Sequence, residues 1–107
     1  MLRETTYNGH TYKLGDFVYF IEEETDYTFC YFGKIKCIKP FKLFEEDNNQ
    51  CIIEVLYTEH GFKFPEPFEK LTISSYLRPA RESLDMLIND KQNEIKALTE
   101  IYKEVEQ

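Results

Sequence analysis

The residues with the greatest potential for catalysis or metal binding are two histidines and three cysteines: His10, His60, Cys30, Cys37 and Cys51. The histidines lie in separate turn-like regions, and the cysteines lie in strand patterns beside aromatic residues. A nucleophilic thiol needs a neighbouring base, and a zinc site typically has ligands at short paired spacings such as CxxC. The sequence has no CxxC pair and no GxSxG, HExxH or phosphate-binding glycine motif. It therefore predicts no catalytic residue, metal site or cofactor, and it predicts buried, unreactive thiols.

Two acidic runs, Glu22–Glu24 and Glu45–Asp47, are the other groups that could carry acid–base chemistry. A general acid at neutral pH needs burial, which raises its pKa. A run of adjacent charges is typical of a solvated loop. We therefore predict a protein that is not an enzyme, and keep a small enzyme domain as the second alternative.

Aromatic residues make up 16% of the chain, with nine Phe and eight Tyr. Most are expected to pack in the core or at its rim. Because ring faces attract ammonium groups, two or three exposed rings beside a carboxylate would form a site for a cationic side chain. The aromatic content thus favours a β-rich domain with a binding surface.

Length and net charge exclude further classes of protein. The 107 residues are enough for about one domain, and the net charge is −7. An acidic chain lacks the basic footprint for direct nucleic-acid binding or for an anionic membrane, but it suits a basic partner or simply favours solubility. No apolar run is long enough to span a bilayer, and three cysteines without paired spacing indicate reduced thiols. Reduced thiols are typical of the cytosol and the nucleus, so we expect one of these two locations.

Residues 1–79 read as short strands separated by turns. The first segment, 12–22, is predicted to contain a turn at Gly15-Asp16 followed by a strand over 17–21. Further strands are predicted over 27–38, 51–58 and 71–77, with Pro40 ending the strand 27–38 and Gly33 marking a bulge or close approach. Residues 45–49 are predicted to form a loop, and 60–68 an irregular crossing because of Pro65 and Pro67. The predicted core residues are Ile35, Ile38, Ile53, Val55 and, by alternation, Phe17, Val18 or Tyr19. This pattern favours a mainly β fold, a small, strongly bent SH3-like barrel.

Residues 80–107 form a second region, in which 81–105 are predicted to be one amphipathic helix. Its apolar residues follow steps of four and three: Leu84, Ile88, Ile95, Leu98, Tyr102 and Val105, with Lys91 in the remaining slot and Leu87 and Ile101 widening the face. Leu84, Leu87 and Ile88 are expected to dock on the barrel. Ile95, Leu98, Tyr102 and Val105 are expected to form a coiled-coil-like interface, with a second copy or with a partner helix.

Three segments resemble the bromo-adjacent homology (BAH) family: Tyr12–Tyr19 (YKLGDFVY), Tyr31–Ile38 (YFGKIKCI) and Ile53–Tyr57 (IEVLY). The resemblance implies a BAH-like barrel that acts as a non-enzymatic, chromatin-associated interaction module and recognises a basic, histone-type peptide. It also implies candidate cage residues: Tyr19, Tyr57 and Glu59. A Tudor-like or other SH3-like interaction domain stays open. A scaffold subunit that joins a larger complex through its helix is the first alternative function.

Overall fold

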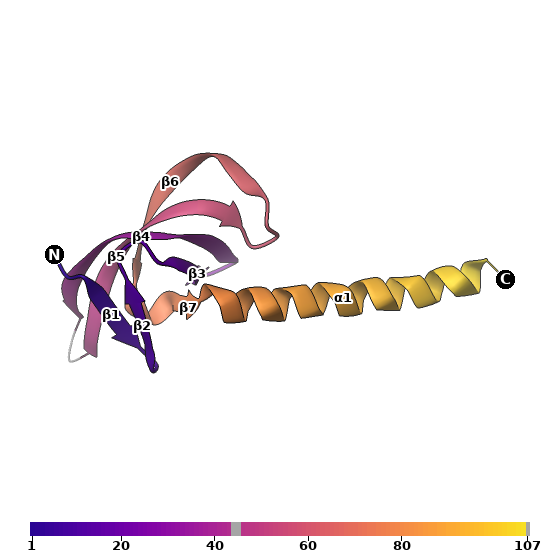
Figure 1. Ribbon diagram of the computed structural model, residues 1–107, viewed down its shortest axis with the longest axis horizontal. Helices are drawn as coiled ribbons and strands as arrows, with labels where there is room; N and C mark the ends of the chain where they lie inside the picture. Colours follow the sequence, from indigo (N-terminus) through magenta and orange to yellow (C-terminus); the bar gives the residue numbers. More distant parts are fainter. Residues whose placement is uncertain (44–45, 107) are drawn as a thin grey trace.

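The computed structural model describes residues 1–43 and 46–106, which form a curled β-sheet domain followed by one projecting helix (Figure 1). The strands are β1 (Glu4–Tyr7), β2 (His10–Lys13), β3 (Phe17–Glu23), β4 (Thr28–Leu43), β5 (Glu46–Thr58), β6 (Lys63–Ile73) and β7 (Leu77–Pro79). A short 3₁₀ helix, η1 (Ser74–Tyr76), separates β6 from β7, and the helix α1 spans Ala80–Val105. The predicted mainly β fold with a long C-terminal helix is confirmed.

Five strands form one antiparallel sheet in the order β6-β5-β4-β3-β7. Within the described residues no pairing joins β6 to β7, so the sheet curls without closing into a continuous barrel. The first two strands, β1 and β2, form a separate hairpin that the strand prediction missed. Its turn is Asn8-Gly9, with positive φ at both residues (52° and 79°), which is the geometry that an Asn-Gly pair favours between two strands.

The main core lies on the inner face of the curled sheet. The predicted residues Val18, Ile35, Ile38, Ile53 and Val55 are at most 1% exposed. The remaining buried members of this cluster are Tyr12, Phe20, Cys51 and Leu77. Tyr19 lies on the opposite face of β3 in a second, smaller cluster, and Phe17 is 38% exposed. Successive side chains of β3 therefore pack alternately on the two faces of the sheet, and both faces carry a cluster of buried residues.

Gly33 is a close approach between two strands, as predicted. The register of β4 against β5 shifts between Phe32 and Gly33. A Cβ at Gly33 would overlap the carbonyl oxygen of Glu54 and lie 2.7 Å from Ile53 Cγ2. Only glycine allows β5 to pass this close.

Four of the predicted segments differ from the structure. Pro40 does not end its strand, since β4 continues to Leu43. The strand β3 pairs with β4 only up to Lys34, so at Pro40 the edge of β4 that faces β3 needs no backbone N–H donor for a ladder. Residues 46–49 belong to β5 rather than to a loop, while residue 45 lies outside the described residues.

Residues 63–68 belong to β6, where Pro65 and Pro67 are tolerated at the sheet edge beside the register shift between Val55 and Tyr57. The predicted strand 71–77 is divided among the end of β6, η1 and the start of β7.

Among the residues that the structure describes, the helix α1 contacts the sheet only through its first two turns. Ala80 and Ser83 are buried, and Leu87 packs against the second cluster. Ser83 Oγ also donates a hydrogen bond to the Pro79 carbonyl oxygen at 2.9 Å. The expected docking of Leu84 and Ile88 was wrong, since they are 41% and 51% exposed. Residues 80, 83 and 87 share one narrow face, so the wider apolar face turns away from the sheet as the helix projects (Figure 1).

Candidate functional site

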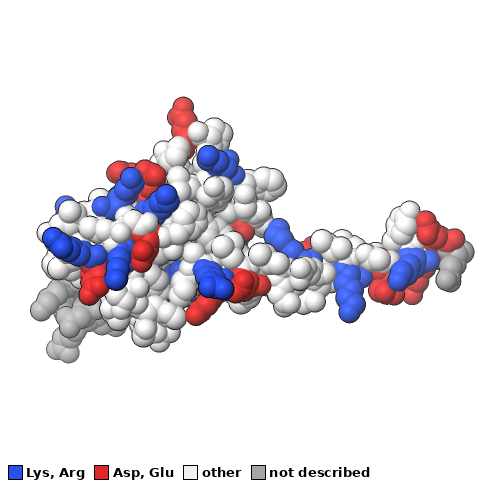
Figure 2. Space-filling view, viewed as in Figure 1, with Lys and Arg blue, Asp and Glu red and all other residues white. Residues whose placement is uncertain are grey.

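The projecting part of α1 carries a row of exposed apolar side chains, which we call the α1 stripe. Its members are Leu84, Ile88, Ile95, Leu98, Ile101, Tyr102 and Val105, and they are between 41% and 78% exposed. A shallow hollow lies along it, lined by Ile95, Leu98, Thr99 and Tyr102. Figure 2 shows uncharged surface along this helix between separated groups of charged residues. An apolar surface of this length is typical of a protein-association site.

The predicted cage residues Tyr19, Tyr57 and Glu59 gather near the second cluster, on the outer face of the sheet. Tyr19 is 6% exposed and its ring packs 4.7 Å from the ring of Phe32. Tyr57 is half-buried, and its ring centroid lies 6.0 Å from that of Phe17. The two partly exposed rings therefore belong to Tyr57 and Phe17, while Tyr19 is buried against Phe32.

Glu59 is the acidic member of this group. Its side chain is 40% exposed, and its Oε1 lies 3.4 Å from His60 Nε2. The pKa of Tyr19 is raised, mainly because the side chain is buried. The neighbouring Cys30 thiol and the negative charge of Glu59 raise it further. Burial also raises the pKa of Cys30. A thiol that stays protonated is a poor nucleophile, so this group is better suited to binding than to covalent chemistry.

The other candidates for catalysis or metal binding are dispersed. His10 Nε2 lies 4.0 Å from Glu82 Oε2 at the base of α1. Cys51 is fully buried, and burial, with a smaller effect of Cys37, raises its pKa to about 11. Among the described residues, no group of three or more His, Cys, Asp or Glu side chains could hold a metal ion.

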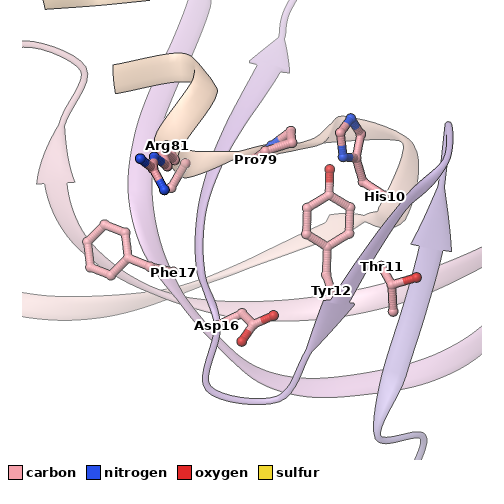
Figure 3. A pocket seen from close by; sticks show the side chains of 8 residues that line it. His10, Thr11, Tyr12, Asp16, Phe17, Pro79 and Arg81 are labelled. Atoms are coloured by element: carbon pink, nitrogen blue, oxygen red, sulfur yellow. The ribbon is translucent and has the colours of Figure 1, made fainter. Parts of the chain in front are cut away.

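A hollow of about 390 Å³ lies between β2, the following turn and the first turn of α1 (Figure 3). Its charged or titratable lining residues are His10, Tyr12, Asp16 and Arg81. Asp16 Oδ2 accepts a hydrogen bond from the Lys13 N–H at 2.9 Å, and Tyr12 Oη donates to the Leu77 carbonyl oxygen at 3.4 Å. Two of the polar side chains here therefore stabilise the turn and the strand next to them.

An ammonium site that the sequence did not predict lies on the inner face. Lys70 Nζ lies 2.8 Å from Glu22 Oε2, 5.7 Å from the Phe29 ring centroid and 6.0 Å from that of Tyr31. Glu22 was predicted to be a solvated loop residue, but it lies in β3 with a side chain that is only 22% exposed. The hydrogen bond to Glu22 raises the pKa of Lys70 despite partial burial. Two rings and a carboxylate thus hold a cation that belongs to the chain itself.

Comparisons of the chain with known protein families, with curated proteins and with solved structures found no match. The BAH resemblance therefore stays a prediction that rests on the three sequence segments. Within the described residues, no helix has the length and apolar character needed to cross a membrane.

Proposed function

We propose that this chain is a non-enzymatic protein-interaction module, and that it associates with a second copy of itself through the α1 stripe. The observation that carries the proposal is the exposure of the stripe: Ile95, Leu98, Tyr102 and Val105 are 59–78% exposed. The helix has 26 residues, about 39 Å at 1.5 Å per residue, and within the described part of the chain only its first two turns contact the sheet. A single helix in water gains little from such a face until another helix covers it.

The heptad pattern of α1 supports self-pairing. Ile88, Ile95 and Tyr102 take the a positions, and Leu84, Lys91, Leu98 and Val105 take the d positions. Isoleucine at a positions combined with leucine at d positions favours a parallel coiled coil of two helices. In a parallel pair of helices, each g position of one copy faces the following e position of the other copy. These g–e pairs would be Leu87 with Gln92, Glu94 with Thr99, and Ile101 with Glu106. None of these pairs joins like charges.

Lys91 is the one member of the heptad core that opposes pairing. At a d position it would face its counterpart in the second copy. A lone lysine in the core of a coiled coil lowers stability and restricts the register. Glu94, one turn later on the same helix, offers each ammonium group a nearby carboxylate.

Thermal unfolding at several protein concentrations tests this proposal. The unfolding midpoint of the full chain should rise with concentration, because association stabilises the folded state by mass action. Leu98→Asp should remove this dependence, since it places a charge in the interface. Asn93→Asp, on the opposite face of α1, is the matched control and should keep it. A midpoint that does not change with wild-type concentration would contradict the proposal.

A second candidate function is recognition of a basic, histone-type peptide in chromatin, with the nuclear location that the BAH resemblance implies. The observation that favours it is the pairing of partly exposed rings at Phe17 and Tyr57 with the Glu59 carboxylate. A cationic side chain could lie against these rings with Glu59 as its counter-ion. Titration of the chain with unmodified and methylated histone-tail peptides tests this function.

A further inference from the structure

Five aromatic rings contact one another at one end of the inner face, and we call them the aromatic row. Its members are Tyr27, Phe29 and Tyr31, at and just before the start of β4, and Phe64 and Phe68 of β6. Neighbouring ring centroids lie 4.6–6.2 Å apart. Tyr31 and Phe64 pack against the main core, whereas Tyr27, Phe29 and Phe68 are 56%, 38% and 38% exposed. These three outer rings form an exposed aromatic surface of the kind that marks an interaction site.

The aromatic row already holds one cation. Lys70 Nζ lies 5.7 Å from the Phe29 ring centroid and 6.0 Å from that of Tyr31, beside the Glu22 carboxylate. The faces of aromatic rings are negatively polarised and attract cations. The position of Lys70 therefore shows that these rings, next to a carboxylate, suit a cationic group. Within the described residues, no lysine or arginine lies over the more exposed ring of Tyr27.

Glu24 is the carboxylate beside this exposed end of the row. Its N–H donates to the Tyr27 carbonyl oxygen at 2.8 Å, so the two residues face each other across the turn between β3 and β4. Glu22 pairs with Phe29 in the register of β3 and β4, and alternation places Glu24 on the same side as Glu22. The hydrogen bond to Glu22 is the main cause of the raised pKa of Lys70, and the charge of Glu24 contributes to it. In the part of the chain that the structure describes, Glu24 forms no ion pair.

The charge around the aromatic row is strongly negative. The two segments that supply its rings and their neighbours, 22–31 and 63–70, carry six acidic and two basic residues, a net charge of −4 out of the −7 of the chain. One of the two lysines, Lys70, is already bound to Glu22. Such a surface repels phosphate groups, so it suits neither nucleic acid nor an anionic membrane, and it attracts a basic segment of a protein.

We propose that the exposed end of the aromatic row binds an arginine side chain in a basic segment of a partner protein. The guanidinium group stacks on the rings of Tyr27 and Phe29, and Glu24 is its counter-ion. Arginine fits this place better than lysine, because its planar, weakly hydrated guanidinium stacks on aromatic rings and its N–H groups match a carboxylate. The proposal depends neither on the pairing of α1 nor on the Tyr57 surface, which lies on the outer face of the sheet.

Titration of the full, ¹⁵N-labelled chain with an acetylated, amidated Gly-Arg repeat of six residues tests the site. The same repeat with citrulline in place of arginine is the reference, because citrulline keeps the planar shape of the side chain without its charge. The amide signals of Tyr27, Phe29 and Phe68 should shift and saturate with the arginine peptide and stay in place with the citrulline peptide. Added sodium chloride should weaken the binding, since salt screens exposed charges.

Variants of the two central residues test their roles. Tyr27→Leu removes the exposed ring but keeps an apolar side chain, and it should weaken binding by about threefold to fivefold. Tyr27→Phe keeps the ring and should bind like the wild type. Glu24→Gln should weaken binding by about threefold, because the counter-ion is lost. Both side chains are exposed, so these variants leave the core intact.

Three control variants separate this site from other surfaces, and each should bind the arginine peptide like the wild type. Tyr7→Leu removes an exposed ring elsewhere, Glu23→Gln changes the carboxylate on the other face of β3, and Leu98→Asp disrupts the α1 stripe. The proposal is overturned if no signal saturates, if the citrulline peptide gives the same shifts, or if the shifting signals are those of the Tyr57 surface instead. It is also overturned if Tyr27→Leu and Glu24→Gln bind as tightly as the wild type.

Discussion

Lys70 on β6 and Glu22 on β3 form an ion pair of 2.8 Å, although two strands separate β6 from β3 in the sheet. Three strand spacings in a flat sheet would place the two backbones about 14 Å apart. Side chains stand roughly upright on a sheet, so the pair requires strong curvature that turns the two strands toward each other. The pair is thus a direct measure of how far this open sheet bends toward a barrel.

Breaking this ion pair should destabilise the domain. Both side chains are partly buried, so the interaction lies between a surface pair and a fully buried one, and we expect a coupling free energy of about 1–2 kcal/mol. The measurement is a double-mutant cycle of Lys70→Met and Glu22→Gln by denaturant unfolding. Lys63→Met, on the exposed part of β6, is the control. A coupling energy near zero would mean that the pair does not hold the curl.

Alkaline pH should destabilise the domain through Cys51. Burial raises the pKa of this thiol from 9.0 to about 11, so the folded state keeps its proton at a pH where the unfolded state releases it. The free energy of unfolding is therefore fully maintained below pH 9 and falls between about pH 9 and 11, by on the order of 2 kcal/mol from this group. Cys51→Ala should show a smaller fall over the same range, measured by denaturant unfolding. Equal slopes for the two proteins would refute this assignment.

The sequence predicted the inner core well, because residues such as Ile53 and Val55 combine β propensity with an alternating pattern that only one packed face satisfies. The helix was also predictable, because after Pro79 the apolar residues of the sequence change from a strand-like to a helical spacing. The hairpin of β1 and β2 was missed despite the Asn8-Gly9 signal, because the short segments around it are mostly polar. The C-terminal part of β4 was missed because Pro40 was taken to end the strand. A proline is disfavoured where a strand has neighbours on both sides, but at Pro40 only β5 pairs with β4.

The candidate sites were predictable only in part. The exposed α1 stripe follows directly from the heptad pattern, but how many of its residues dock depends on the direction in which the helix leaves the sheet. The ammonium site of Glu22 and Lys70 joins residues 48 positions apart. Their meeting depends on the curl and register of four strands, which no local pattern specifies.

Gly33→Ala tests the close approach of β4 and β5. The added Cβ would overlap the Glu54 carbonyl oxygen, so one strand must shift and the core next to it must repack. We expect a loss of about 1–3 kcal/mol in unfolding free energy. Lys39→Ala, at an exposed position of the same strand, should cost far less. A Gly33→Ala protein as stable as the wild type would show that this register shift is not tightly constrained.

Tyr57→Ala tests the second candidate function. If a basic side chain binds against the rings of Phe17 and Tyr57, binding of a histone-tail peptide should weaken by roughly 1–2 kcal/mol, measured by calorimetry. Glu59→Gln should weaken it less and should reduce its dependence on salt. Tyr7→Ala removes an exposed ring elsewhere and serves as the control. Unchanged affinity for Tyr57→Ala would exclude this surface as the peptide site.

Sedimentation equilibrium of the full chain tests self-association through α1 most directly. Between micromolar and submillimolar concentrations, the measured mass should rise from 12.9 kDa toward twice that value, because covering the α1 stripe requires a second helix. Leu98→Asp should stay near the mass of one chain over the whole range, while Asn93→Asp should follow the wild type. A wild-type mass that remains at 12.9 kDa at the highest concentration would contradict the account.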